Sequence, residues 1–321
     1  MAKERIVWID IAKAFGIYLV VLGHSLQQDM PIENGLRNYI YIFHMPLFFF
    51  ISGYLFKLSN DFKAYLQKNT YSLLVPYVFL NVVAFFLWLP VYVYGNHDIW
   101  EKVFNFFVGD SHSPAGPAWF LLCLFWVRIC AYWLCKIEFK IQAFVIIGCG
   151  FLSYFFPARL FWCIDSTFMA LPFFMLGYYL KQYKGVKYHR CSFFSFLILF
   201  LATIGISLIQ GNTDVNYRIM GYYPLLYFPG AIIGVLSVYN GAYLIKKDNE
   251  LIKVFASGSI VIMGLHGCFN SYLNAPFDIL LPTYVTEHWL YPVIMSFLVL
   301  MVMYYPILFI QKYFSRFIGG R

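Results

Sequence analysis

Charged residues are scarce in this sequence. Asp, Glu, Lys and Arg make up only 12% of its 321 residues, against roughly a quarter in an ordinary soluble domain. This scarcity excludes a soluble enzyme and a disordered chain, because both classes depend on charged side chains to stay in water. The seven cysteines contain no CxxC pair and no metal-ligand spacing, so we expect neither a disulfide scaffold nor a metal site.

Hydrophobic residues are correspondingly abundant, at 61% of the chain, and the mean hydropathy is +0.68. A helix that spans a bilayer needs about 20 apolar residues, so this content is enough for about ten of them. An open sheet cannot span lipid, and the apolar runs lack the alternation of a membrane barrel. The sequence therefore predicts an all-α polytopic membrane bundle of about ten transmembrane helices, forming a single domain over residues 1–321.

The ten apolar runs have different lengths. The fifth and ninth are short, and three glycines in the ninth favour a bend or a re-entrant segment. The runs lie at roughly 6–26, 39–56, 71–94, 117–135, 141–156, 164–180, 193–210, 222–244, 256–272 and 289–311.

The distribution of basic residues predicts the orientation. With the N-terminus inside, seventeen of the 23 Lys and Arg fall in inner segments and four in outer loops. Membrane proteins carry such an excess in cytoplasmic loops, so we expect both termini in the cytoplasm. The same bias accounts for the net charge of +8 without nucleic acid as a partner. No internal repeat supports a transporter built from two halves.

The first apolar run carries three ionisable residues, Asp10, Lys13 and His24. Such groups are costly in lipid and mark functional sites. At about 100° per residue all three share one helix face, with Lys13 and His24 roughly 16 Å apart along the axis. Asp10 is expected to hold Lys13 in place as an i,i+3 neighbour and is a candidate substrate-binding residue. The alternative is an ion pair at the cytoplasmic end with His24 as an interfacial histidine.

Two further histidines, His44 and His266, lie at a depth similar to that of His24 in the outer half of the predicted bilayer. Three histidines are able to hold zinc, but no two of these share a run, which disfavours a metal. A histidine also acts as a general base on a hydroxyl, because its pKa lies near neutrality. We therefore take His24, His44 and His266 as the candidate catalytic residues.

Other polar residues are weaker candidates. Lys68 and Arg128 are placed to meet a phosphate at the cytoplasmic face, although Arg128 is equally suited to snorkelling. Trp119 and Asp165 are candidate substrate contacts, with an aromatic belt residue and a helix N-cap as the respective alternatives. The loop at 95–116 is the longest and is the expected acceptor-facing lid.

Two segments resemble a known family. Residues 8–25 read WIDIAKAFGIYLVVLGHS and residues 43–56 read FHMPLFFFISGYLF. Both resemble acyltransferase family 3, which comprises bacterial integral membrane O-acyltransferases related to enzymes that acetylate surface polysaccharides. Looser likeness continues over most of the chain, at Lys68 to Tyr77, 117–121, 165–177 and 262–266.

The resemblance implies particular roles. The family places an arginine in the first helix, followed after ten intervening residues by a histidine. His24 matches the histidine, while Lys13 replaces the arginine and lacks its planar fork. By this resemblance acetyl-CoA is the cytoplasmic acyl donor, with its phosphates near Lys13, Lys68 or Arg128. His24 is then the general base.

The resemblance also implies a multi-pass protein of the bacterial cytoplasmic membrane. It moves an acetyl group to a hydroxyl of a sugar, surface glycan or lipid-linked saccharide reached from the outer side. An acetyl-histidine intermediate and direct transfer both stay open, as does a homo-oligomer. The rival hypotheses are a transporter or flippase for a lipid-linked saccharide, and a non-catalytic membrane partner.

Overall fold

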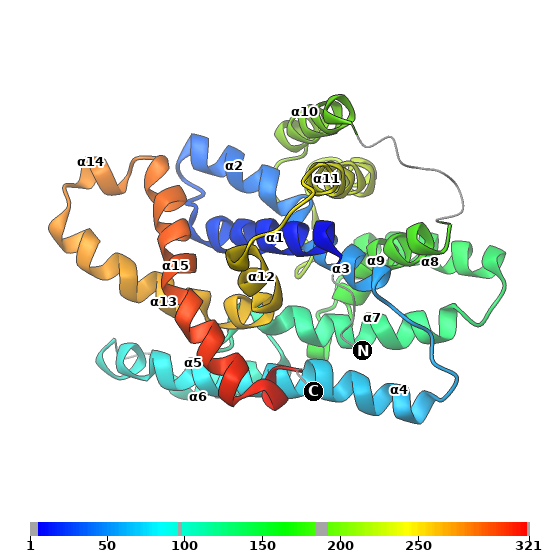
Figure 1. Cartoon of the computed structure of the whole chain (residues 1–321), viewed down its shortest axis with the longest axis horizontal. Coiled ribbons are helices and arrows are strands. Elements are labelled where there is room, and N and C mark those ends of the chain that lie inside the picture. Colours follow the sequence, from blue (N-terminus) through cyan, green and yellow to red (C-terminus); the bar gives the residue numbers. More distant parts are fainter. Residues whose placement is uncertain (1–5, 96–97, 184–191, 320–321) are drawn as a thin grey trace.

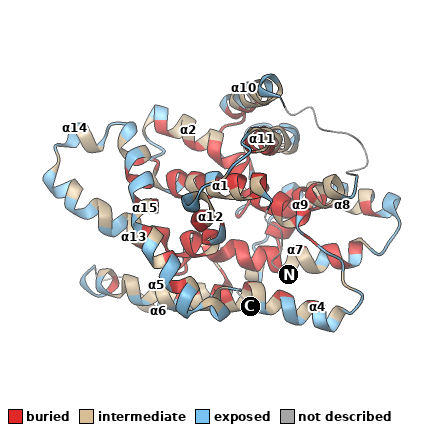
Figure 2. Cartoon of the chain, viewed as in Figure 1, coloured by how far each residue is buried: buried red, intermediate tan, exposed pale blue. Residues whose placement is uncertain are grey.

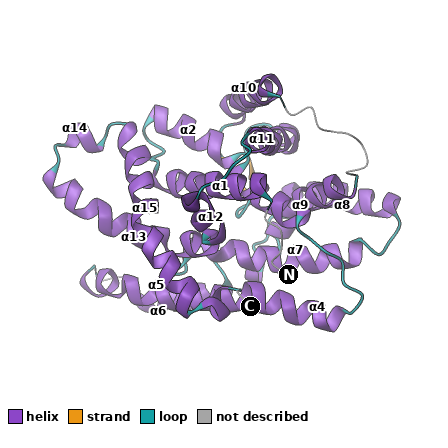
Figure 3. Cartoon of the chain, viewed as in Figure 1, coloured by secondary structure: helices purple, strands orange, loops and turns teal. Residues whose placement is uncertain are grey.

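The computed structural model describes residues 6–95, 98–183 and 192–319, and these are helical almost throughout (Figure 3). One small antiparallel hairpin pairs Thr213 with Met220. The elements are α1 (Val7–Ser25), α2 (Pro31–Tyr41), α3 (His44–Tyr54), α4 (Phe62–Asn69), η1 (Thr70–Leu74), α5 (Val75–Tyr94), α6 (Ile99–Val108), η2 (Gly116–Ala118), α7 (Trp119–Leu134), α8 (Phe139–Phe155), η3 (Phe161–Cys163), α9 (Ser166–Gln182), α10 (Phe193–Gln210), β1 (Thr213–Asp214), β2 (Ile219–Met220), α11 (Pro224–Leu244), α12 (Glu250–Ser257), α13 (Ser259–Leu280), α14 (Thr283–Thr286), α15 (Leu290–Tyr313) and η4 (Ser315–Ile318).

The expected all-α membrane bundle is confirmed. Within the described ranges, seven helical stretches are long and apolar enough to cross a bilayer, and the bent pair α12–α13 makes an eighth if counted as one span. The other two apolar runs form shorter helices, α3 and α8. The count of ten and the cytoplasmic termini therefore stay predictions.

The run at 39–56 is not one helix, as the sequence predicted, but two. Its first residues belong to α2, and the chain leaves helical geometry at Phe43, whose φ is −132° and ψ is −16°. The unbroken apolar sequence hid this break, because periodicity does not reveal a single non-helical residue. The break places His44 at the first position of α3 and Pro46 within its first turn, where a missing N–H costs little.

The ninth run contains the expected bend. Helices α12 and α13 meet at 85°, with Gly258 between them. A Cβ at Gly258 would lie 2.4 Å from the Ile307 side chain of α15, so a glycine allows the close approach of that helix. Helix α13 also continues to Leu280, beyond the predicted end at 272.

The helices differ in how deeply they are buried. Helix α1 runs through the middle of the bundle, whereas α10 lies at its edge, and α14 with the end of α13 projects to one side (Figure 1). Buried residues gather on α1, α3, α7 and α9 (Figure 2). A helix surrounded by others can carry polar groups that lipid would not tolerate, so α1 is suited to hold the ionisable stripe.

Helices α3 and α9 pack backbone to backbone through glycines, and Gly53→Ala tests this contact. A Cβ at Gly53 would lie 1.8 Å from the Phe174 carbonyl oxygen, and one at Gly177 2.0 Å from that of Phe50. Since a backbone cannot move aside like a side-chain tip, we expect Gly53→Ala to lower the free energy of unfolding by about 3 kcal/mol. Thermal unfolding in detergent measures the loss.

Gly205→Ala is the matched control, because a Cβ at Gly205 in α10 meets no atom within 4 Å. Alanine at this helical position is expected to stabilise by about 0.5–1 kcal/mol. Equal melting temperatures for the two variants would show that α3 and α9 do not meet in this way.

Candidate active site

The structure brings the three predicted histidines together, from α1, α3 and α13. The ring centroids of His24 and His266 are 5.2 Å apart. The ring of Tyr41 links the third histidine, at 6.2 Å from His24 and 4.8 Å from His44. Their roles in catalysis stay a prediction, but one site holding all three is a feature of the fold.

Hydrogen bonds differ among the three rings. Nδ1 of His44 lies 3.0 Å from the Ile40 carbonyl oxygen, and Nδ1 of His266 lies 2.9 Å from that of Ile262. A carbonyl only accepts, so both rings donate from Nδ1 and leave Nε2 as an acceptor when neutral. His24 has no hydrogen-bond partner among the described residues. It is therefore the histidine with both nitrogens available to a substrate.

His24 is exposed, and its neighbour in sequence lines a polar cavity. The next residue, Ser25, lines a cavity of about 430 Å³ between α1, α2 and the α13–α15 segment. The Ser25 hydroxyl donates to Asn270 Oδ1 at 3.4 Å and accepts from Ser296 at 3.3 Å. Asn274 in turn donates to Asn270. This polar chain connects α1, α13 and α15 beside the histidines.

Arg37 and Tyr41 are functional candidates that sequence reasoning missed. The guanidinium of Arg37 lies 3.9 Å from the centre of the Tyr41 ring and donates to Asn212 Oδ1 at 2.8 Å. Arg37 is buried, at 9% exposure. It therefore holds the ring that lies between two of the histidines. Its position on the predicted outer side, against the general charge bias, is the sequence signal that could have identified it.

Asp165 does not act as the N-cap that the sequence suggested. It occupies the N-cap position of α9, but its side chain bonds no amide of that helix. Instead the fully buried carboxylate lies 3.2 Å from Arg159 and 3.1 Å from Arg218. It also accepts from the Leu160 N–H. These contacts join the loop before α9 to the β1–β2 hairpin, and they indicate a structural role.

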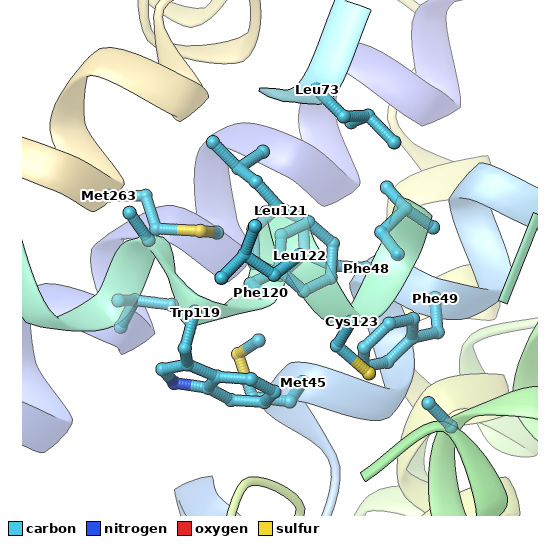
Figure 4. Close-up of a cluster of buried hydrophobic side chains, with 14 of the residues drawn as sticks. Met45, Phe48, Phe49, Leu73, Trp119, Phe120, Leu121, Leu122, Cys123 and Met263 are labelled. Carbon is cyan, nitrogen blue, oxygen red and sulfur yellow. The ribbon is translucent and has the colours of Figure 1, made fainter. Parts of the chain in front are cut away.

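Trp119 begins α7 inside the core, so the aromatic-belt alternative is wrong. It is 6% exposed and belongs to the buried cluster that includes Met45 and Met263 (Figure 4). Met45 follows His44 in sequence, and Met263 lies one turn before His266. Trp119 thus supports the wall beneath the histidines, and direct contact with a substrate stays a prediction.

Two of the predicted phosphate ligands lie in one region. Arg128 of α7 donates to Asn69 at 3.4 Å and to Ser72 at 3.3 Å. Lys68, the neighbour of Asn69 at the end of α4, is exposed. The adjoining turn η1 is π-helical, a distortion that is frequent at functional sites.

Asp10 and Lys13 lie on α1, whereas Lys68 lies on α4 and Arg128 on α7. Helix α1 packs mainly against α11, α12, α13 and α15. The structure therefore does not gather all three predicted phosphate ligands on neighbouring helices.

The loop predicted as a lid is partly helical, because it contains α6. Residues 96–97 lie outside the described ranges. Its later part, around Ser111 and Pro114, forms a cavity of about 340 Å³ with Gly264 and Gly267, which flank His266. Burial would raise the pKa of Asp110 in this loop, but hydrogen bonds from the backbone and ring of His112 hold that pKa below its ordinary value.

The chain is similar to known proteins. A family model described as an acyltransferase domain matches residues 6–311. Nodulation protein NolL of Sinorhizobium fredii is 27% identical over 195 residues, which cover 56% of this chain and 50% of the relative. The chain thus spans half the length of that curated relative. No solved structure matches the chain.

Proposed function

Because the chain belongs to this acyltransferase family, we propose that it is a transmembrane O-acetyltransferase of the bacterial cytoplasmic membrane. The donor is cytoplasmic acetyl-CoA, and the acceptor is a hydroxyl of a sugar or surface glycan reached from the outer side. One observation carries the proposal. His24 lies beside His266, has no hydrogen-bond partner in the described chain, and is followed by Ser25, which lines a polar cavity.

The proposed step is a proton transfer coupled to acyl transfer. A ring nitrogen of His24 takes the proton of the acceptor hydroxyl while the hydroxyl oxygen attacks the thioester carbonyl carbon. The C–O bond forms, the C–S bond breaks, and CoA leaves as a thiolate that takes the proton from His24. An acetyl-histidine intermediate is the alternative route to the same products.

His266 and His44 would orient the reacting groups. Because each donates its Nδ1–H to a backbone carbonyl, its neutral ring presents Nε2 as an acceptor. The rings of His24 and His266 are only 5.2 Å apart, with no hydrogen bond between them in the described structure. We expect Nε2 of His266 to accept from His24 once the acceptor is bound and so to set the tautomer of His24. Such a supporting partner is common for catalytic histidines.

Lys68→Ala tests the donor side of the proposal. Lys68 is exposed beside the region of Arg128, and an ammonium attracts the phosphates of CoA. We expect KM for acetyl-CoA to rise roughly fivefold with kcat almost unchanged, since the contact is the same in ground and transition states. Lys63→Ala on another face of α4 is the matched control. Equal KM values for both variants would remove Lys68 from the donor site.

The activity itself is tested with the purified full chain in detergent or liposomes. Acetyl-CoA is supplied with a panel of glycans, and both CoA release and transfer of labelled acetyl are followed. Release and labelling in parallel are the expected result. Movement of a lipid-linked saccharide across liposomes without CoA release would replace the proposal with the transporter hypothesis.

A further inference from the structure

The cavity beside His24 has a distinctive charge. Three carboxylates line it, from Glu33, Asp278 and Glu287, together with amide and hydroxyl groups such as those of Gln27 and Asn274. The described lining contains no Lys, Arg or His. A ligand in this cavity therefore meets negative charge and hydrogen-bonding groups but no compensating cation.

Glu33 shows that this negative charge is built into the fold. Its side chain is 2% exposed, and one carboxylate oxygen accepts from the Gln27 N–H at 2.7 Å. Among the described residues, no basic side chain lies within ion-pair distance of it. Arg37, one turn later on α2, is directed to Asn212 and Tyr41 instead.

A buried carboxylate without a cation is costly unless donors satisfy its oxygens. The other Glu33 oxygen accepts from no donor among the described residues, so it is open to a donor on a ligand in the cavity. Hydroxyl groups and protonated amines donate hydrogen bonds. A carboxylate or phosphate on the ligand would be repelled at short range by buried Glu33, and more weakly by Asp278 and Glu287, which are exposed to solvent.

We propose that the acceptor is a hydroxyl-rich saccharide that carries no acidic group and binds in this cavity. The inference rests on the proposed function and names the acceptor class for the same site. The hydroxyls bind Glu33, Asp278 and the amides, and the cavity is also lined by Ser25, the residue that follows His24. An amino group on the sugar is tolerated or favoured, and a uronate or phosphate is rejected.

Matched oligosaccharides test this selectivity. We would measure kcat/KM with acetyl-CoA for glucose, glucosamine and glucuronate oligomers of equal length. The neutral and amino oligomers are expected to exceed the acidic one by roughly tenfold or more, as short-range repulsion predicts. The double variant Asp278→Asn/Glu287→Gln should lower the ratio of kcat/KM for the neutral oligomer to kcat/KM for the acidic one. Glu138→Gln removes an exposed carboxylate at the start of α8 and should leave the ratio unchanged.

A kcat/KM for the acidic oligomer equal to or higher than that for the neutral one would overturn the inference, even if CoA release shows that the protein is an acetyltransferase. If no acceptor is acetylated, the proposed function fails separately. Equilibrium binding of the same three oligomers to the full chain without donor then decides the inference. A lower Kd for the neutral or amino oligomer than for the acidic one supports the inference, and equal Kd values contradict it.

Discussion

His24→Ala is expected to lower acetyl transfer by about 10²–10⁴-fold, the range that a positioned general base supplies. The site explains why this histidine dominates. His44 and His266 each commit Nδ1 to a backbone carbonyl, whereas His24 has both nitrogens available. Steady-state release of CoA, with labelled acetyl transferred to glycan, measures the loss.

His288→Gln is the matched control for this variant. His288 is exposed, and its Nδ1 accepts from the Leu290 N–H, a bond that glutamine can replace. Its activity is expected to stay within about twofold of the wild type, since His288 follows Glu287 but does not itself line the acceptor cavity, and most exposed substitutions are nearly neutral. A folded His24→Ala protein with near wild-type transfer would refute the catalytic assignment.

Asp165→Asn is expected to lower the free energy of unfolding by about 3–5 kcal/mol, because removing one partner of a buried ion pair leaves an uncompensated charge. Two arginines converge on this fully buried carboxylate, and the Arg218 side chain is itself only 7% exposed. Asparagine has nearly the same shape as aspartate, so the decrease in stability reports the lost charge and not a change in packing. Thermal and chemical unfolding in detergent provide the measurement.

Glu101→Gln is the comparison for the buried pair. Glu101 lies 3.8 Å from Lys102 and is 55% exposed, and exposed pairs contribute about 1 kcal/mol or less. A stability loss for Asp165→Asn no larger than that of Glu101→Gln would contradict the buried network. The folded fraction of Asp165→Asn should keep its activity per molecule, since Asp165 stabilises the loop and hairpin rather than the histidines.

Composition and periodicity were enough for the class of protein and for several helices. The bounds of α1 and α10 differ from the predicted runs by no more than a residue, because a membrane span is a local property of about 20 residues. The bend near Gly258 could also be predicted from the sequence, since glycines are frequent where a helix bends. The break at Phe43 could not be predicted, because only one residue there departs from helical geometry.

The candidate site divides in the same way. Ionisable residues in apolar runs stand out in sequence, which identified His24, His44 and His266 without reference to their neighbours. Their proximity depends on the tertiary structure, since the packing of α1 against α13 brings His24 and His266 into contact. Arg37 escaped notice because it lies on the polar helix before the apolar run.

The sequence by itself determined that this chain is an apolar helical membrane protein with histidines in its apolar runs, because each of those properties depends on residue type and local spacing. Only the tertiary structure decided which partners those residues have. The ring of Tyr41 between two histidines, the arginines on Asp165 and the uncompensated Glu33 all depend on three-dimensional placement. Charge and hydrogen bonding act through distance in space, and distance in space is set by packing.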